Sequence, residues 1–82
     1  MANISMDEAK NALMIGVRST LRAIENRTGK KFAKDDLLAV SKVIKKNLFN
    51  EAGSILASEK FTMQQAIAIV DKAVDDVIAE FS

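Results

Sequence analysis

The spacing of apolar residues predicts a first helix over about residues 6–27. These residues recur at intervals of three, four or seven positions, as one buried face of an α-helix requires; they are Met6, Leu13, Val17, Leu21 and Ile24. Ser5, with Glu8 three residues later, forms a capping-box pattern at the start of this segment. Gly29 follows its end, where a left-handed cap residue is expected.

A second, longer helix is predicted over about residues 34–59. The apolar rows keep one phase through Gly53, so a single helix is favoured over a stop near Leu48, with Gly53 as the point where it could kink. The rows comprise Leu37, Val40, Ile44, Leu48, Ala52 and Ile55, flanked by Leu38, Phe49 and Leu56. Together they cover about half the circumference, more than a surface helix normally shows. We therefore expect this helix to be the central one, touching two neighbours.

The third predicted helix spans about residues 63–81. Thr62 and Gln65 form a second capping box before it. Its apolar stripe consists of Met63, Ile67, Val70, Val74, Val77, Ile78 and Phe81. The chain shows no strand pattern, and the short connections make consecutive helices antiparallel neighbours. The sequence thus predicts one all-α domain over residues 1–82, either a three-helix bundle or a helical hairpin plus a helix, with a long central helix.

The length of 82 residues limits the size of the hydrophobic core. Small domains are usually supplemented by disulfides, metals or oligomerisation. Disulfides are excluded, because the chain has no Cys. We therefore expect a homo-oligomer, or unusually good packing of the helices.

The chain has few side chains suited to catalysis or metal binding. The chain contains no His, Cys or Tyr, which removes the commonest general base and metal ligand. The acidic pairs Asp35–Asp36 and Asp75–Asp76 are adjacent in sequence, so on a helix they point about 100° apart and do not converge. The sequence predicts a protein that is not an enzyme, with no catalytic residue, metal site or cofactor.

The N-terminal residues and the lengths of the apolar runs bear on the cellular location of the protein. The N-terminal residues lack the basic stretch and apolar run of a signal peptide. No apolar run approaches the ~20 residues that span a bilayer. We expect a cytoplasmic protein that does not insert into the membrane.

Charge is unevenly distributed along the chain, although the formal net charge is only +1. Residues 1–48 carry ten basic and five acidic side chains, a net +5, and residues 49–82 carry two and six, a net −4. Such a split favours head-to-tail or two-sided association. The basic half also allows weak nucleic-acid binding through Lys30, Lys31, Lys34, Lys42, Lys45 and Lys46. This remains the alternative, because no aromatic side chain interleaves these lysines for base stacking.

Three β-branched residues fall on the polar faces of the predicted helices: Ile15, Val43 and Ile69. With Arg18 and Arg22, which flank Ile15, they form a candidate protein interface. The competing interpretation is that the predicted helix phases are off by a residue and that these side chains belong to the core. The leading hypothesis is a helical protein-interaction regulator that binds another protein.

In length, charge and helical content the whole chain resembles small cytosolic regulators encoded by bacteriophages, such as the lysis-inhibition co-antiholins of T-even phages. The resemblance rests on these global properties and on no motif, so it carries over no site residues. It implies binding to the cytosolic segment of a holin and control of lysis timing.

Overall fold

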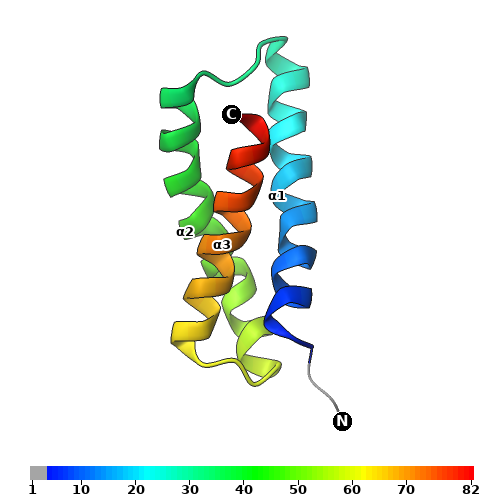
Figure 1. Cartoon of the computed structure of the whole chain (residues 1–82), viewed down its shortest axis with the longest axis vertical. Helices are drawn as coiled ribbons and strands as arrows, with labels where there is room; N and C mark the ends of the chain where they lie inside the picture. The colour runs from blue at the N-terminus through cyan, green and yellow to red at the C-terminus, as the bar shows by residue number, and fades with distance from the viewer. Residues whose placement is uncertain (1–3) are drawn as a thin grey trace.

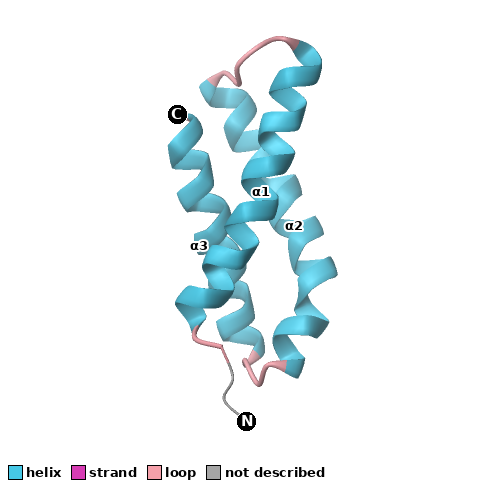
Figure 2. Ribbon diagram, turned by 90° about the vertical axis from the view of Figure 1, so that its right-hand side faces the viewer, coloured by secondary structure: helices cyan, strands magenta, loops and turns pink. Residues whose placement is uncertain are grey.

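The computed structural model describes residues 4–82, and three α-helices make up almost all of them. They are α1 (Met6–Thr28), α2 (Lys34–Ser58) and α3 (Met63–Phe81), with no strand in this part of the chain. The all-α prediction is confirmed, and the helix bounds agree with the predicted ones to within a residue. Helix α2 runs through Gly53 without interruption. The two short connections lie at opposite ends of the bundle, so consecutive helices are antiparallel (Figure 2).

The predicted caps fix three of the helix ends. The Ser5 hydroxyl accepts a hydrogen bond from the Glu8 N–H at 3.1 Å, and the Glu8 carboxylate accepts one from the Ser5 N–H at 2.9 Å. These contacts hold the pKa of Glu8 below its ordinary value, the backbone hydrogen bond being the larger cause. Thr62 and Gln65 form the same reciprocal pair before α3. Gly29 ends α1 in the left-handed conformation, with φ 71°.

The central helix is α3, and the prediction that the second helix would be central is wrong. Helix α3 packs along both α1 and α2, whereas the backbones of α1 and α2 approach each other in few places (Figure 1). The apolar width of α2 misled the prediction, because Leu38, Val43 and Ile55 are each more than half exposed. Width on a helical wheel counts apolar side chains, but it does not show which of them a neighbour covers.

The buried face of α3 is rotated from the predicted stripe. Ala66, Ile69 and Ala73 are buried, whereas Met63, which begins the predicted stripe, is 73% exposed. The assignment of Ile69 to a surface interface is therefore wrong: this side chain is 2% exposed and belongs to the core. The competing interpretation, a phase error, holds for Ile69. The physical reason is that α3 is covered from two sides, so its buried arc extends beyond the largest side chains.

The core forms two clusters along the bundle axis. One lies towards the α2–α3 turn, where Ala9 of α1 and Leu56 of α2 pack with Val70 of α3. The other lies towards the α1–α2 connection, where Val17 and Leu21 of α1 pack against Val74 and Val77 of α3. In this second cluster α2 contributes only partly buried side chains: Val40, Ile44 and Leu48. The core is thus incompletely covered between α1 and α2.

Candidate functional site

A groove runs between α1 and α2. We call the line along which two helices face each other a seam, and the groove follows the α1–α2 seam, which α3 does not cover. It consists of three adjoining hollows of about 340, 370 and 270 Å³. Ile24 and Val40 line both the first and the second hollow, and Thr20 and Ile44 line both the second and the third. The groove exists because α3 separates α1 from α2. Its lining comprises Gly16, Val17, Thr20, Ile24, Thr28, Lys30, Lys31, Phe32, Asp36, Ala39, Val40, Val43, Ile44, Asn47, Leu48 and Glu51.

The middle of the groove is an exposed apolar surface. Val43 is 58% exposed and Ile24 is 38% exposed, while Val40 and Ile44 are half-buried at the floor. The polar side chains beside them, Thr20 and Asn47, are uncharged. Apolar area of this kind, rimmed by polar groups, is typical of a protein-interaction surface.

Around Gly16 the α1 wall of the groove carries smaller side chains than the facing part of α2, although Val17 and Ile24 also line the α1 wall. The α1 wall includes Gly16 and Thr20, and a Cβ atom placed on Gly16 would meet nothing within 4 Å. The α2 wall instead carries the branched side chains of Val43 and Ile44. The α1 wall therefore leaves space at Gly16, and Val43 and Ile44 project from the α2 wall.

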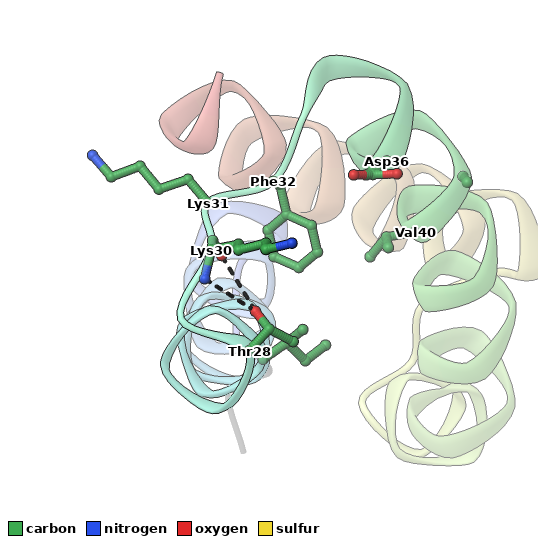
Figure 3. Close-up of a pocket in the computed structure, with 8 residues that line it drawn as sticks. Thr28, Lys30, Lys31, Phe32, Asp36 and Val40 are labelled. Atoms are coloured by element: carbon green, nitrogen blue, oxygen red, sulfur yellow. Dashed lines mark hydrogen bonds between the residues drawn. The ribbon is translucent and has the colours of Figure 1, made fainter.

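The walls also differ in charge. The end of the groove near the α1–α2 connection has Lys30 on the α1 side and Asp36 on the α2 side. In Figure 3 the Lys30 side chain points into this hollow, whereas the Lys31 side chain extends away from it. At the far end the α2 wall carries Glu51. The charged groups of the α1 wall and connection are thus basic, and those of the α2 wall are acidic.

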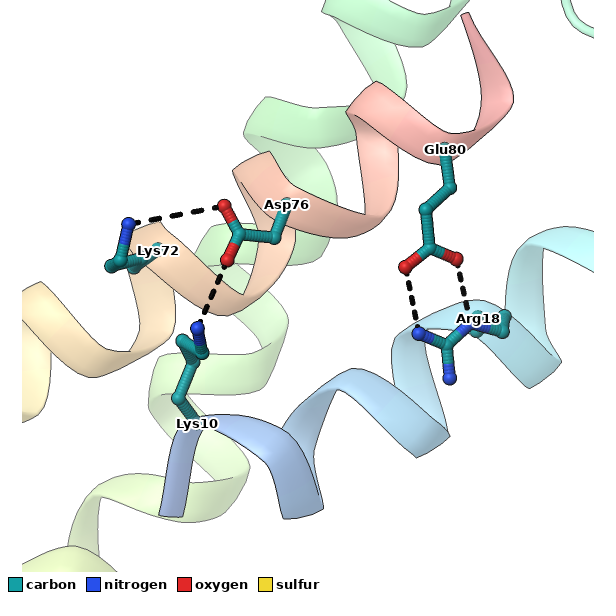
Figure 4. A network of polar contacts seen from close by, with 5 residues as sticks. All are labelled: Lys10, Arg18, Lys72, Asp76 and Glu80. Carbon is teal, nitrogen blue, oxygen red and sulfur yellow. Dashed lines mark hydrogen bonds and ion pairs between the residues drawn. The ribbon is translucent and has the colours of Figure 1, made fainter. Parts of the chain in front are cut away.

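Ion pairs join α3 to both of its neighbours. Arg18 of α1 donates two hydrogen bonds of 2.7 Å to the Glu80 carboxylate, and the Lys10 ammonium lies 3.1 Å from Asp76 (Figure 4). On the other side Lys45 of α2 lies 2.9 Å from Asp75. Between residues 4 and 82, every ion pair that joins two helices has one partner on α3.

These ion pairs account for part of the charge difference between the two halves of the chain. The acids of α3 largely neutralise basic residues of the same molecule, so much of the split is satisfied internally. At Glu80 the hydrogen bonds from Arg18 hold the pKa of the carboxyl below its ordinary value. The same contact raises the pKa of Arg18.

The five residues predicted as a protein interface do not form one surface. Ile15 is 67% exposed, as predicted, but it does not line the groove. Arg18 is held by Glu80, and the Arg22 guanidinium lies 5.7 Å from the centre of the Phe81 ring, so both arginines serve the seam between α1 and α3. Only Val43 reaches the groove.

Two of the six lysines of the nucleic-acid alternative lie next to acids. Lys45 is paired with Asp75, and Lys34 is followed directly by Asp35 and Asp36 in the first turn of α2. Phe32, an aromatic residue beside the lysines of the connection, is half-buried and packs edge-on against Phe81 at 6.4 Å. Its ring therefore already packs against another aromatic ring of the bundle.

Sequence reasoning missed most residues of the groove. Ile24 was assigned to the core face, and Thr20, Ala39 and Asn47 carried no motif. One signal was present: Gly16 and Thr20 stand one helical turn apart on the flank of the apolar stripe of α1, where they allow close approach. Only the position of α3 shows that this flank faces open space.

A second apolar hollow, of about 410 Å³, lies at the α2–α3 turn. It is lined by Phe49, Gly53, Ala57, Phe61, Thr62, Met63 and Ala66. It lies on a seam that the two helices already close, and none of its lining residues is charged. The groove between α1 and α2 is therefore the stronger candidate.

Comparisons with protein-family models, curated proteins and solved structures found no match. Within residues 4–82 no helix is long and apolar enough to cross a membrane. The same residues contain no group of three acidic, His or Cys side chains placed to hold a metal ion. We therefore infer the function from the geometry of the groove.

Proposed function

We propose that the protein is a non-catalytic interaction regulator that binds an amphipathic helix of a partner protein in the groove between α1 and α2. The observation that carries the proposal is the exposed apolar surface around Val43 and Ile24, on the one seam that α3 leaves open. A helix laid there would cover Val40 and Ile44 as well and would complete a four-helix arrangement. Helix-in-groove recognition of this kind uses apolar anchors at i, i+3, i+4 and i+7.

The length of the groove defines the partner. Along α2 it runs from Asp36 to Glu51, which at 1.5 Å per residue is about 22 Å, or roughly four helical turns. A partner helix of about 15 residues with one apolar stripe matches this length. Because the α1 side is basic at the connection end, the partner should carry an acidic residue facing Lys30.

The resemblance to phage lysis regulators supplies a specific candidate for the partner. We propose the cytosolic segment of a holin, whose capture would delay lysis. This finer proposal is supported by the resemblance in size, charge and helicity, and the groove adds only a surface of suitable shape.

Two matched substitutions test the proposal. Val43→Lys places a charge in the groove, whereas Ile15→Lys places the same charge on the outer face of α1; both side chains are more than half exposed, so neither change should unfold the bundle. We expect a synthetic holin segment, titrated into isotope-labelled protein, to shift amide resonances of Thr20, Ile24 and Val43. Val43→Lys should weaken this binding at least about tenfold, about 1.4 kcal/mol, and Ile15→Lys should leave it unchanged.

The outcome that contradicts the groove is binding that Ile15→Lys abolishes and Val43→Lys does not. If the holin segment does not bind, affinity capture from the native cell with the same two variants tests the general proposal. The partner should then be retained by Ile15→Lys and lost by Val43→Lys. Tight binding of DNA or RNA that falls steeply with salt would instead support the nucleic-acid alternative.

A further inference from the structure

We infer that the free protein pairs with a second copy through the same groove, in a parallel two-fold dimer in which α2 of each copy packs against α1 of the other. A rotation axis that runs along the groove produces this arrangement and keeps the two α1–α2 connections at the same end. A two-fold interface uses one patch twice, so the patch must be complementary to itself. The two walls of the groove meet this requirement in size and in charge.

The shape argument rests on the difference between the walls. The axis brings the Val43 and Ile44 side chains of one copy onto the Gly16 and Thr20 region of the other. Since a Cβ on Gly16 would meet nothing within 4 Å, the α1 wall has room for a branched side chain from outside. Each copy offers the projecting side chains of Val43 and Ile44 and the open stretch around Gly16, so the contact is made twice.

The charge argument selects the parallel orientation. Lys30 and Asp36 lie on opposite sides of the same hollow, so the axis along the groove sets the Asp36 of each copy near the Lys30 of the other. Turning one copy end for end would instead lay α2 upon α2. That would oppose Asp36 to Glu51 and one projecting wall to another.

The size of the molecule permits an interface of ordinary size. It measures 45 by 18 by 18 Å, so a copy laid parallel to it can contact it along the whole groove, and one long face is of the same order as the ~800 Å² that each partner buries in a standard protein–protein complex. A single partner helix of four turns covers only part of this face, whereas a second copy runs along all of it.

The dimer has a regulatory consequence, which rests on the proposed function. A partner helix and a second copy would occupy the same groove and exclude each other. The apparent affinity for the partner should then fall as the concentration of the protein rises. The dimer itself does not depend on any partner.

Sedimentation equilibrium of the pure protein, together with its melting temperature at several concentrations, tests the dimer. We expect a dimer at micromolar concentration and a melting temperature that rises with concentration. Val43→Lys should raise the dissociation constant at least about tenfold, and Ile15→Lys should leave it unchanged. Gly16→Leu should also weaken the dimer, because it fills the open stretch of the α1 wall, and it should favour the helix, since a Cβ at this position meets nothing within 4 Å in the monomer.

A charge exchange tests the orientation. Asp36→Lys and Lys30→Glu should each weaken the dimer, and the double variant should restore it. Asp35→Lys is the matched control, because it changes the same charge in the first turn of α2 but does not line the groove.

A monomer at every concentration, with a constant melting temperature, would overturn the inference. So would a dimer that Ile15→Lys weakens and Val43→Lys does not. Neither result touches the proposed function, because partner binding is measured separately on the monomer. Conversely, a dimer with these properties that binds no partner helix would refute the proposed function alone.

Discussion

Two isoleucines illustrate how position decides the role of a side chain. Ile69 is covered by the core of the bundle, whereas Ile15 projects from the outer face of α1. Each has a basic residue three positions later, Arg18 after Ile15 and Lys72 after Ile69, so the two look alike on a helical wheel. Their contributions to stability should therefore differ widely, although the side chains are identical.

Truncation of each isoleucine measures this difference. Ile69→Ala removes buried methyl and methylene groups and leaves a cavity, so it should lower the free energy of unfolding by about 2–5 kcal/mol. Ile15→Ala should change it by no more than about 0.5 kcal/mol. Urea unfolding followed by circular dichroism, at a concentration where both variants are monomeric, gives both values. Equal losses would show that Ile69 is not buried.

The ion pair between Arg18 and Glu80 makes stability depend on pH. Its hydrogen bonds lower the pKa of Glu80 in the folded protein, so the pair stabilises the fold above the unfolded pKa of about 4.3. This contribution is lost as the pH falls through the lowered pKa. Both side chains are solvent-accessible, so we expect a small effect.

Glu80→Gln isolates this contribution. The difference in free energy of unfolding between the wild type and the variant should be constant above about pH 5 and should shrink as the pH falls below about 4. Urea unfolding at a series of pH values measures it. A difference that grows towards low pH would contradict the assigned direction of the pKa shift.

At the scale of single elements, two glycines have opposite effects on the stability of their helices. Gly29 ends α1 with φ 71°, a conformation that strains any residue with a Cβ. Gly53 lies within α2 at an ordinary helical conformation, and a Cβ placed there would meet nothing within 4 Å. The first glycine is required by the backbone, and the second only weakens its helix.

Alanine at these two positions should therefore act in opposite directions. Gly29→Ala should lower the free energy of unfolding by about 1–2 kcal/mol, because alanine in the left-handed conformation is strained. Gly53→Ala should raise it by about 0.5–1 kcal/mol, since alanine restricts the unfolded chain and favours the helix. Thermal and urea unfolding would show both changes. Destabilisation by Gly53→Ala would mean that α2 needs flexibility at this point.

At the scale of the whole molecule, the three seams between helices are unequal. Helix α3 has the most completely buried face and carries the acids that pair with both neighbours. In the core cluster nearer the α1–α2 connection, α2 contributes only partly buried side chains, and no ion pair joins α1 to α2 in the portion the structure describes. The bundle is therefore held together from α3 outwards.

Native-state hydrogen exchange should reveal this order. Amides of α3 around Val70, Val74 and Val77 should exchange most slowly, through global unfolding. Amides in the first turns of α2, which border the open groove, should exchange faster through local opening. Exchange of α3 that is no slower than that of early α2 would contradict a bundle centred on α3.

Much of this architecture follows from local sequence alone. The helix bounds come from the spacing of apolar residues and from caps such as Ser5, Gly29 and Thr62, whose effects act within one turn of backbone. Local rules of this kind need no partner from elsewhere in the chain. For the same reason the sequence indicated one uninterrupted α2 through Gly53.

The rest depended on the relative placement of helices, which no local pattern encodes. Burial of Ile69, exposure of Leu38 and the central place of α3 all follow from which face a neighbour covers. Ion pairs such as Lys10–Asp76 join residues far apart in the sequence and turn an apparent charge split into internal pairing. Likewise, the groove belongs to no helix: it appears because α3 separates α1 from α2, and only the tertiary structure could show it.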